Sequence, residues 1–328
     1  MRILIYHPVK LPVLQYGGTE RVVMWLCHTL KKEGHQVAVL AAPGSTMPPG
    51  IECITDPRVA LKRARDWDVV HGFTKPGPEF YEAFREKVLV TIQGNGQVGE
   101  KFHRNTVFVS RNHAQRHSAK AFVYNGLDPA ELKFSEAARP HRYLFLSKTS
   151  WRVKNLKGAA SLCRRFDQSL WIAGGPSPYP LRAYSAVKPG WKWVGSVNQA
   201  QKADFLLEGK AMLFPILWNE PFGIVMTESL VSGTPVIAHP FGSVPEVLEF
   251  APQCLVNLFE KDYFDRISAL FSGDVKLPSA RECREWVLKN FDQVAMTRKY
   301  VSLYEQVMQG AFLHETEPVT KVGAEEIQ

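Results

Sequence analysis

The stretch that most constrains the fold spans residues 211–248, AMLFPILWNEPFGIVMTESLVSGTPVIAHPFGSVPEVL. Residues 211–217 are almost wholly apolar, which is typical of a strand buried on both faces of a parallel sheet. Residues 223–231 then carry apolar side chains at helical spacing, and Gly233 stands where a helix ends in the left-handed conformation. Residues 236–238 form the next apolar run. This strand–helix–strand order predicts an α/β fold with a parallel sheet.

Two carboxylates mark the point where the first of these strands gives way to the helix. Glu220 falls in the turn, and Glu228 follows inside the helix. Open α/β sheets bind ligands at this edge, beyond the carboxyl ends of their strands. Carboxylates this far apart do not share one metal ion, but they can hold the two ends of a long polyhydroxylated ligand. Phe222 and Gly223 add backbone N–H groups at the start of the helix.

The segments NEPFGIVMTESLVSGTPVIA and GSVPEVL resemble the E-x(7)-E signature of retaining GT-B glycosyltransferases of family 4. The resemblance implies two Rossmann-like, doubly wound parallel-sheet domains that face each other across a cleft. It also implies transfer of a hexose from a nucleotide-diphosphate sugar to an acceptor hydroxyl with retention of configuration. By the resemblance, Glu228 binds the ribose hydroxyls and Glu220 the hydroxyls of the transferred sugar. Phe222 and Gly223 contribute backbone contacts to that sugar.

A basic segment, LSKTSWRVKNLKG, opens the second half of the chain. It resembles the family's segment of an Arg followed by a Lys, with Lys148 at the Arg position. Lys154 takes the Lys position, one residue further along than in the family's pattern, and Arg152 and Lys157 remain alternatives for it. Cations are needed here because cleavage leaves negative charge on the diphosphate. The competing interpretation is a solvated basic loop.

We expect no metal in this chemistry. The only candidate for an Asp-x-Asp metal motif, at residues 66–68, leads into a predicted strand instead of following one. Catalysis is therefore expected to be independent of divalent metal and to need no cofactor besides the donor substrate.

The N-terminal half repeats the strand–helix alternation. The first expected strand, residues 2–6, leads to the loop YGGTE, where Gly17 and Gly18 precede a helix and form an anion site by geometry. By resemblance to the family, these glycines approach the donor diphosphate. Gln93 occupies the position where the family usually has a histidine, and its amide can still bind a sugar hydroxyl. His71, His103 and His113 are the alternatives for that missing histidine.

The domain organisation follows from these elements and from a polar linker at residues 134–142. We predict an N-terminal acceptor domain (1–138), a C-terminal donor domain (139–290), a helix that crosses back to the first domain (291–312), and a frayed tail (313–328). Acceptor contacts are expected in loops 9–16, 73–78 and 94–101.

Composition limits the partners and the compartment. The net charge of +8 points to acidic partners, but no block of Lys and Arg typical of nucleic-acid binding occurs. Five cysteines without metal-type spacing indicate reduced thiols. With no secretory leader pattern and no long apolar run, we expect a cytoplasmic protein. The basic charge also supports the hypothesis of peripheral contact with an anionic membrane.

The expected partners are a nucleotide sugar, with UDP or GDP as its nucleotide, and a hydroxyl acceptor in a glycan, lipopolysaccharide or glycolipid. Two other functions remain open. A nucleotide-sugar epimerase shares the GT-B architecture, and a non-catalytic nucleotide-sugar-binding protein would explain the absence of the loop histidine. The sequence does not identify the base, the sugar or the acceptor.

Overall fold

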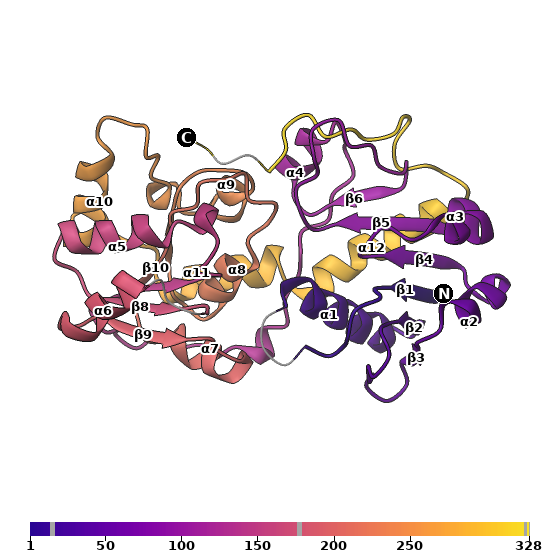
Figure 1. Cartoon of the computed structure of the whole chain (residues 1–328), viewed down its shortest axis with the longest axis horizontal. Coiled ribbons are helices and arrows are strands. Elements are labelled where there is room, and N and C mark those ends of the chain that lie inside the picture. The colour runs from indigo at the N-terminus through magenta and orange to yellow at the C-terminus, as the bar shows by residue number, and fades with distance from the viewer. Residues whose placement is uncertain (14–16, 176–178, 325–326, 328) are drawn as a thin grey trace. The chain divides into compact units, whose positions relative to one another are not determined.

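The structure is a computed structural model that describes residues 1–13, 17–175, 179–324 and 327. The chain forms two compact units (Figure 1). Unit 1 comprises Met1–Leu127 and Phe291–Ala324, and unit 2 comprises Asp128–Asn290. Unit 2 is therefore an insertion in the chain of unit 1.

Unit 1 alternates strands and helices along its N-terminal segment and receives its last helix from the C-terminal segment. Its elements are β1 Arg2–Tyr6, α1 Gly18–Lys32, β2 Gln36–Leu40, β3 Glu52–Ile54, α2 Pro57–Lys62, β4 Val69–Gly72, α3 Pro78–Phe84, β5 Val88–Ile92, β6 Thr106–Phe108, α4 Arg111–Arg116 and α12 Gln293–Met308, with short 3₁₀ turns at Ala64–Asp66 and Arg85–Lys87.

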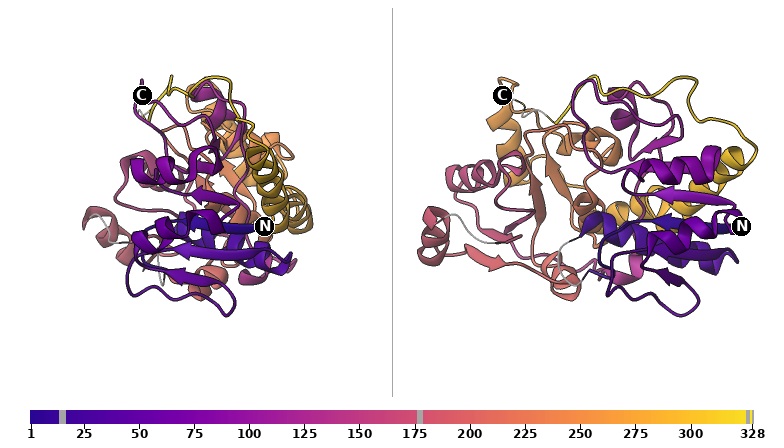
Figure 2. Two further views of the ribbon diagram at one scale, coloured as in Figure 1. Left: turned by 90° about the vertical axis from the view of Figure 1, so that its right-hand side faces the viewer. Right: turned by 45° about the vertical axis from the view of Figure 1, so that its right-hand side comes forward.

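The six strands of unit 1 form a parallel sheet in the order β3-β2-β1-β4-β5-β6. Because strand side chains alternate between the two faces, Leu4, Val70 and Val90 pack with α2 and α3 on one face. The opposite face meets α1 and α12, and Figures 1 and 2 both show α12 lying against this sheet. The order reverses between β1 and β4, as in doubly wound folds.

A buried polar network fixes α12 to the sheet. His71 on β4 forms hydrogen bonds to the Tyr304 hydroxyl through Nδ1 (2.7 Å) and to Thr91 Oγ1 through Nε2 (2.8 Å). Thr91 Oγ1 also meets the Tyr300 hydroxyl at 3.0 Å. All four side chains are fully buried, so each polar atom of the network depends on the others for its partner.

Unit 2 follows the same alternation. Its elements are a 3₁₀ turn at Pro129–Glu131, β7 Tyr143–Leu146, a 3₁₀ turn at Arg152–Lys154, α5 Leu156–Arg165, β8 Leu170–Ala173, α6 Tyr179–Val187, β9 Lys192–Gly195, α7 Gln199–Phe205, β10 Ala211–Phe214, α8 Ile224–Val231, β11 Val236–Ala238, α9 Val244–Val247, a 3₁₀ turn at Pro252–Cys254, α10 Tyr263–Ser272 and α11 Ala280–Asn290.

The five strands of unit 2 pair in parallel in the order β11-β10-β7-β8-β9. The chain proceeds from β7 outward to β9 and then returns to the other side of β7 with β10. The order therefore reverses between β7 and β10, and the carboxyl ends of these two strands are where a ligand is expected. β10 is completely buried, as predicted from its apolar run, although the strand ends at Phe214 and not at Leu217.

Two predictions about the chain's organisation differ from the structure. The predicted boundary at residue 138 falls within unit 2, because Lys133 pairs with Asp204 and the Arg139 guanidinium donates to the carbonyl oxygens of Leu207 and Ser232. The predicted fraying of residues 313–328 is wrong for the part that the structure describes up to Thr320.

That C-terminal segment packs on unit 1, where Figure 1 shows it in yellow beside α4 and β6. The His314 N–H donates to the Arg104 carbonyl (3.1 Å), and the Thr320 N–H donates to the Glu100 carbonyl (2.9 Å). Main-chain bonds of this kind leave no apolar periodicity in the sequence, so the pattern did not predict them. Residues 325, 326 and 328 of the predicted tail, and residues 14–16 of one predicted acceptor loop, lie outside the described residues.

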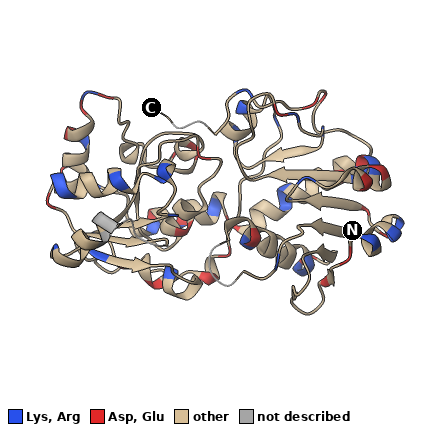
Figure 3. Ribbon diagram, viewed as in Figure 1, with Lys and Arg blue, Asp and Glu red and all other residues tan. Residues whose placement is uncertain are grey.

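None of the helices in the described ranges is both long and apolar enough for a membrane crossing. Figure 3 shows basic and acidic residues interspersed over both units, without a single basic block.

We expect the stability of the protein to fall on acidification through His71. Complete burial lowers the pKa of His71 from 6.5 to about 3. Between these values the unfolded chain binds a proton that the folded chain does not, so the free energy of unfolding decreases as the pH falls below about 6.5. At pH 5 this histidine should cost about 2 kcal/mol. Urea unfolding at pH 7.5 and pH 5 should therefore show a smaller pH effect in His71→Gln than in the wild type; equal effects would contradict this.

We also expect Tyr304→Phe to destabilise the fold by about 1–3 kcal/mol, because it leaves Nδ1 of His71 buried without a partner. Tyr81→Phe is the matched control, since the Tyr81 hydroxyl bonds to none of the described residues. Urea unfolding of both variants at pH 7.5 compares them. A loss no larger in Tyr304→Phe than in Tyr81→Phe would show that the network does not hold α12.

Candidate functional site

The loops that follow β7 and β10 are fixed to each other at the carboxyl edge of the unit 2 sheet. The Leu217 N–H donates to the Val153 carbonyl (2.8 Å), and Asn155 Nδ2 donates to the Pro215 carbonyl (2.8 Å). Asn155 also caps α5 by accepting the Gly158 N–H at 2.9 Å. The segment after β7 that carries Lys154 is therefore held in register with the segment after β10 that carries Glu220.

Lys154 and Glu220 form a buried ion pair between these two loops. Nζ of Lys154 lies 2.5 Å from Oε2 of Glu220, and their side chains are 10% and 9% exposed. Trp218 Nε1 donates to the same carboxylate oxygen at 2.8 Å. Of the three cations considered for this position, Lys154 pairs with Glu220, whereas Arg152 and Lys157 are exposed. The arrangement places a cation, an anion and an indole N–H at one point.

Lys148 lies against the aromatic side chains of the site and not against the carboxylate. Its ammonium lies 4.6 Å from the centre of the Trp151 ring. Trp151 in turn meets Trp218 edge to face, with ring centres 6.2 Å apart, and Lys154 lies 4.7 Å from the Trp218 ring centre. The contacts therefore run from Lys148 through the two tryptophan rings to Lys154, which pairs with Glu220.

The GSVPE segment supports the turn that contains Glu220. The Ser243 N–H donates to the Glu220 carbonyl (2.9 Å), and Ser243 Oγ donates to the Phe222 carbonyl (2.9 Å). A Cβ at position 242 would lie 2.3 Å from the backbone of Glu220, so only Gly242 fits this close approach. Phe222 as a whole, backbone included, is only 1% exposed, so the structure buries this predicted sugar contact inside the turn.

Glu228 lies on α8 and pairs with Lys202 of α7; their side chains are 6% and 12% exposed. Gly223 caps the start of α8 in the left-handed conformation (φ +78°). The first N–H groups of a helix lack partners within it, so they remain available to a ligand. The sequence analysis missed both Lys202 and Trp218 as site residues.

The predicted site residues of unit 1 are Gly17 and Gly18 at the start of a helix and Gln93 after a strand. Gly17 precedes α1, and Gly18 begins it. A Cβ at position 17 would come within 2.7 Å of the Val13 side chain, so a larger residue here would displace that side chain. Gln93 and Asn125 exchange two hydrogen bonds, from Gln93 Nε2 to Asn125 Oδ1 (2.9 Å) and from Asn125 Nδ2 to Gln93 Oε1 (2.8 Å). Gln93 therefore already uses one donor and one acceptor.

The three alternative histidines have structural partners. His71 belongs to the network that holds α12, and His103 packs on the Tyr81 ring. His113 Nε2 meets the Gly94 carbonyl at 3.1 Å. His7, which the sequence analysis did not consider, directly follows β1, and both of its ring nitrogens are buried and bonded to no described residue. Burial lowers the pKa of His7 to about 4, so its ring is neutral near pH 7.

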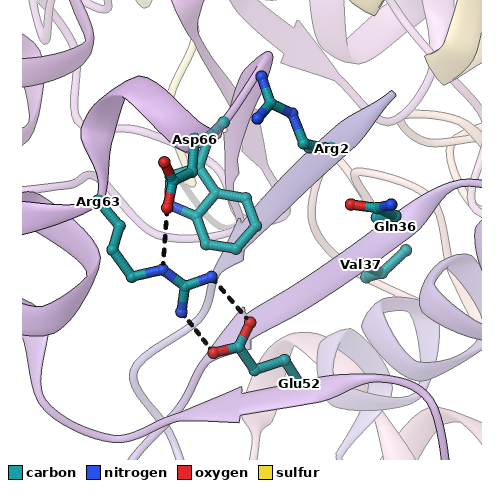
Figure 4. A pocket seen from close by; sticks show the side chains of 7 residues that line it. Arg2, Gln36, Val37, Glu52, Arg63 and Asp66 are labelled. Atoms are coloured by element: carbon teal, nitrogen blue, oxygen red, sulfur yellow. Dashed lines mark hydrogen bonds and ion pairs between the residues drawn. The ribbon is translucent and has the colours of Figure 1, made fainter.

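The pocket that the structure contains in unit 1 does not include these residues. Within the described part of the chain, no three His, Cys, Asp or Glu side chains group closely enough to hold a metal ion. Figure 4 shows a pocket of about 250 Å³ in unit 1, where Arg63 bridges Glu52 and Asp66. Arg2 and Gln36, the first residues of β1 and β2, also line it, so it lies at the amino ends of the strands, opposite the expected ligand edge.

We expect Lys202→Met to destabilise unit 2 by about 3 kcal/mol, because it leaves the buried Glu228 carboxylate without its counter-charge. Lys133→Met is the matched control: its partner Asp204 also lies on α7, but both side chains are about 60% exposed, and its loss should cost less than about 1 kcal/mol. Adding Glu228→Gln to Lys202→Met should recover part of the lost stability in urea unfolding. Similar losses in the two single variants would contradict a buried pair.

Part of the sequence is similar to known proteins. Residues 141–272 match the family model described as Glycosyl transferases group 1, and this range includes both ion pairs. A Klebsiella pneumoniae protein, described as an uncharacterized 41.2 kDa protein in the cps region, is 28% identical over 115 residues. That match covers 34% of this chain and 32% of the relative, about a third of its length.

Solved structures with similar folds cover nearly the whole chain. AviGT4, a glycosyltransferase of avilamycin A biosynthesis, has a TM-score of 0.77 and 22% identity, and the match covers 94% of this chain and 98% of AviGT4. Sucrose-phosphate synthase of Thermosynechococcus elongatus has a TM-score of 0.73 and 14% identity, with 95% and 100% covered. HepE of Anabaena, in complex with UDP and glucose, has a TM-score of 0.67 and 14% identity, with 93% and 99% covered. The chain therefore has the GT-B fold of two Rossmann-like domains, and the family match supports a glycosyltransferase.

Proposed function

We propose that the protein is a retaining glycosyltransferase of family 4, which transfers a hexose from a nucleoside-diphosphate sugar to an acceptor hydroxyl. The observation that carries the proposal is the Lys154–Glu220 pair beyond the carboxyl ends of β7 and β10. It joins a cation suited to a diphosphate with a carboxylate suited to sugar hydroxyls. Glu228, further along α8, is then available for the ribose hydroxyls.

In the proposed reaction, the bond from the anomeric carbon to the diphosphate oxygen breaks while the acceptor oxygen bonds to that carbon from the same face. The acceptor proton passes to the departing phosphate oxygen, so the charges balance without a protein base. Lys154 and Lys148, with Arg152 nearby, supply positive charge where negative charge grows. The backbone N–H of Gly223 adds a neutral donor at the start of α8. No metal is needed in this scheme.

We place the reaction at the cytoplasmic face of a membrane, with an acceptor in a cell-surface glycan, lipopolysaccharide or glycolipid. The relative from a cps region supports an acceptor of this kind. The net charge of +8 supports peripheral contact with anionic lipid. The HepE complexes contain UDP and glucose, which makes UDP sugars the first donors to test, ahead of GDP sugars.

We expect one nucleotide class to stabilise the protein by several degrees in a thermal-shift panel of UDP, GDP, ADP, UDP-glucose and GDP-mannose. Glu228→Gln should remove most of this shift, because the amide does not accept as a carboxylate does. Glu260→Gln is the control, since Glu260 forms an exposed pair with Arg266. The best sugar nucleotide should also be hydrolysed slowly without acceptor, and chromatography of the released nucleotide measures this.

Two results would reject the proposal in different ways. Binding of a sugar nucleotide with no hydrolysis, and no transfer to any acceptor offered, would favour a nucleotide-sugar-binding protein. No stabilisation by any nucleotide would leave the GT-B fold without this function.

A further inference from the structure

Glu220 uses its two carboxylate oxygens differently. Oε2 receives both hydrogen bonds of the side chain, from Lys154 Nζ (2.5 Å) and from Trp218 Nε1 (2.8 Å). Oε1 bonds to no residue in the described part of the chain. A carboxylate accepts through about four lone-pair positions, so this geometry leaves one whole oxygen available.

Trp218 is itself held in place. It lies two residues before Glu220 on the same turn, so its N–H reaches the carboxylate across a short stretch of backbone. One contact of its ring is the Lys154 ammonium, 4.7 Å from the ring centre, and another is the edge-to-face contact with Trp151. An indole fixed by two neighbours donates its single hydrogen in one direction only.

The two donors to Oε2 respond differently when a diphosphate arrives. Lys154 carries a charge and two further N–H groups, so phosphate oxygens compete with Glu220 for it. Trp218 is neutral and has one N–H, which Glu220 already accepts. A diphosphate can therefore draw the ammonium away while the indole bond persists.

We propose that Trp218 is a positioning residue that holds Oε2 of Glu220 so that Oε1 accepts a hydroxyl of the sugar being transferred. This inference rests on the proposed function and names the group that orients its sugar-binding carboxylate. The ligand class is a polyhydroxylated ring on a diphosphate, because Oε1 offers only acceptor positions and Lys154 offers only donors. Trp218 has no contact with the nucleotide part in this scheme.

Trp218→Phe tests the inference because it keeps an aromatic ring and removes the N–H. Trp286→Phe is the matched control in the same unit. Trp286 is also half-buried, donates its indole N–H to a carbonyl oxygen (Val247, 2.9 Å) and packs on an aromatic ring. The assay is hydrolysis of the sugar nucleotide that the wild type prefers, together with binding of the corresponding free nucleoside diphosphate.

We expect Trp218→Phe to lower kcat/KM for hydrolysis about 10- to 100-fold, the range for losing a hydrogen bond to a charged group. Binding of the free nucleoside diphosphate should stay within about twofold of the wild type, which also shows that the variant is folded. In Glu220→Gln, the additional Trp218→Phe change should have a much smaller effect, because the bonded carboxylate is already gone. Trp286→Phe should leave both kcat/KM and nucleotide binding close to the wild-type values.

The outcomes separate this inference from the function on which it rests. An active wild type with a fully active Trp218→Phe variant overturns the inference alone. Equal losses of hydrolysis and free-nucleotide binding also overturn it, because a purely structural role would produce them. A wild type that neither binds nor hydrolyses any sugar nucleotide overturns the proposed function, and this inference with it.

Discussion

The structure of unit 2 depends on how it accommodates a buried ion pair. Removing Lys154 and Glu220 from water costs more than their attraction returns unless further hydrogen bonds complete the pair. Trp218 supplies one such bond, and the backbone of the same turn is fixed by Ser243. A pair of well-packed apolar side chains would stabilise the fold as well or better, so stability alone does not account for these charges at the ligand-binding edge of the sheet.

The second pair, Lys202–Glu228, is also a buried ion pair, and its carboxylate lies on α8, the helix that follows the Glu220 turn. Each carboxylate of the site has its own lysine, so neither is a buried charge without compensation. Both also remain hydrogen-bond acceptors. Their separation along the chain, one before α8 and one inside it, suits an extended ligand better than a compact ion. Unit 2 therefore has the pattern of charges that the proposed nucleoside-diphosphate sugar requires.

The sequence predicted those parts of this site that lie within one continuous stretch. The run from β10 to β11, with Glu220, Glu228 and the cap at Gly223, follows from apolar periodicity and glycine positions, which are local properties. Lys202 is 26 residues from Glu228, and nothing in its own segment marks it as a partner. Trp218 stands two residues before Glu220 in the sequence, but no sequence motif marks a tryptophan as a hydrogen-bond donor to a carboxylate. Only the geometry of the turn directs its N–H to Oε2. The choice among Lys154, Arg152 and Lys157 likewise depended on which side chain the loop turns inward.

Unit 1 also depends on a contact that its sequence pattern does not predict. Here the two partners are much further apart in the sequence, because the last helix of the unit comes from the C-terminal segment. His71 and Tyr304 are 233 residues apart in the sequence, and residues Asp128–Asn290 of unit 2 lie between them in the chain. Hydrogen bonds join the residues at which the chain leaves unit 1 and returns to it. The Leu127 N–H donates to the Phe291 carbonyl (3.0 Å), and the Gln293 N–H donates to the Leu127 carbonyl (2.9 Å). Gly126 is required there, because a Cβ would lie 2.4 Å from the Asp292 carbonyl oxygen. The chain therefore leaves unit 1 for Asp128–Asn290 and returns to it at one point, which hydrogen bonds within unit 1 hold together.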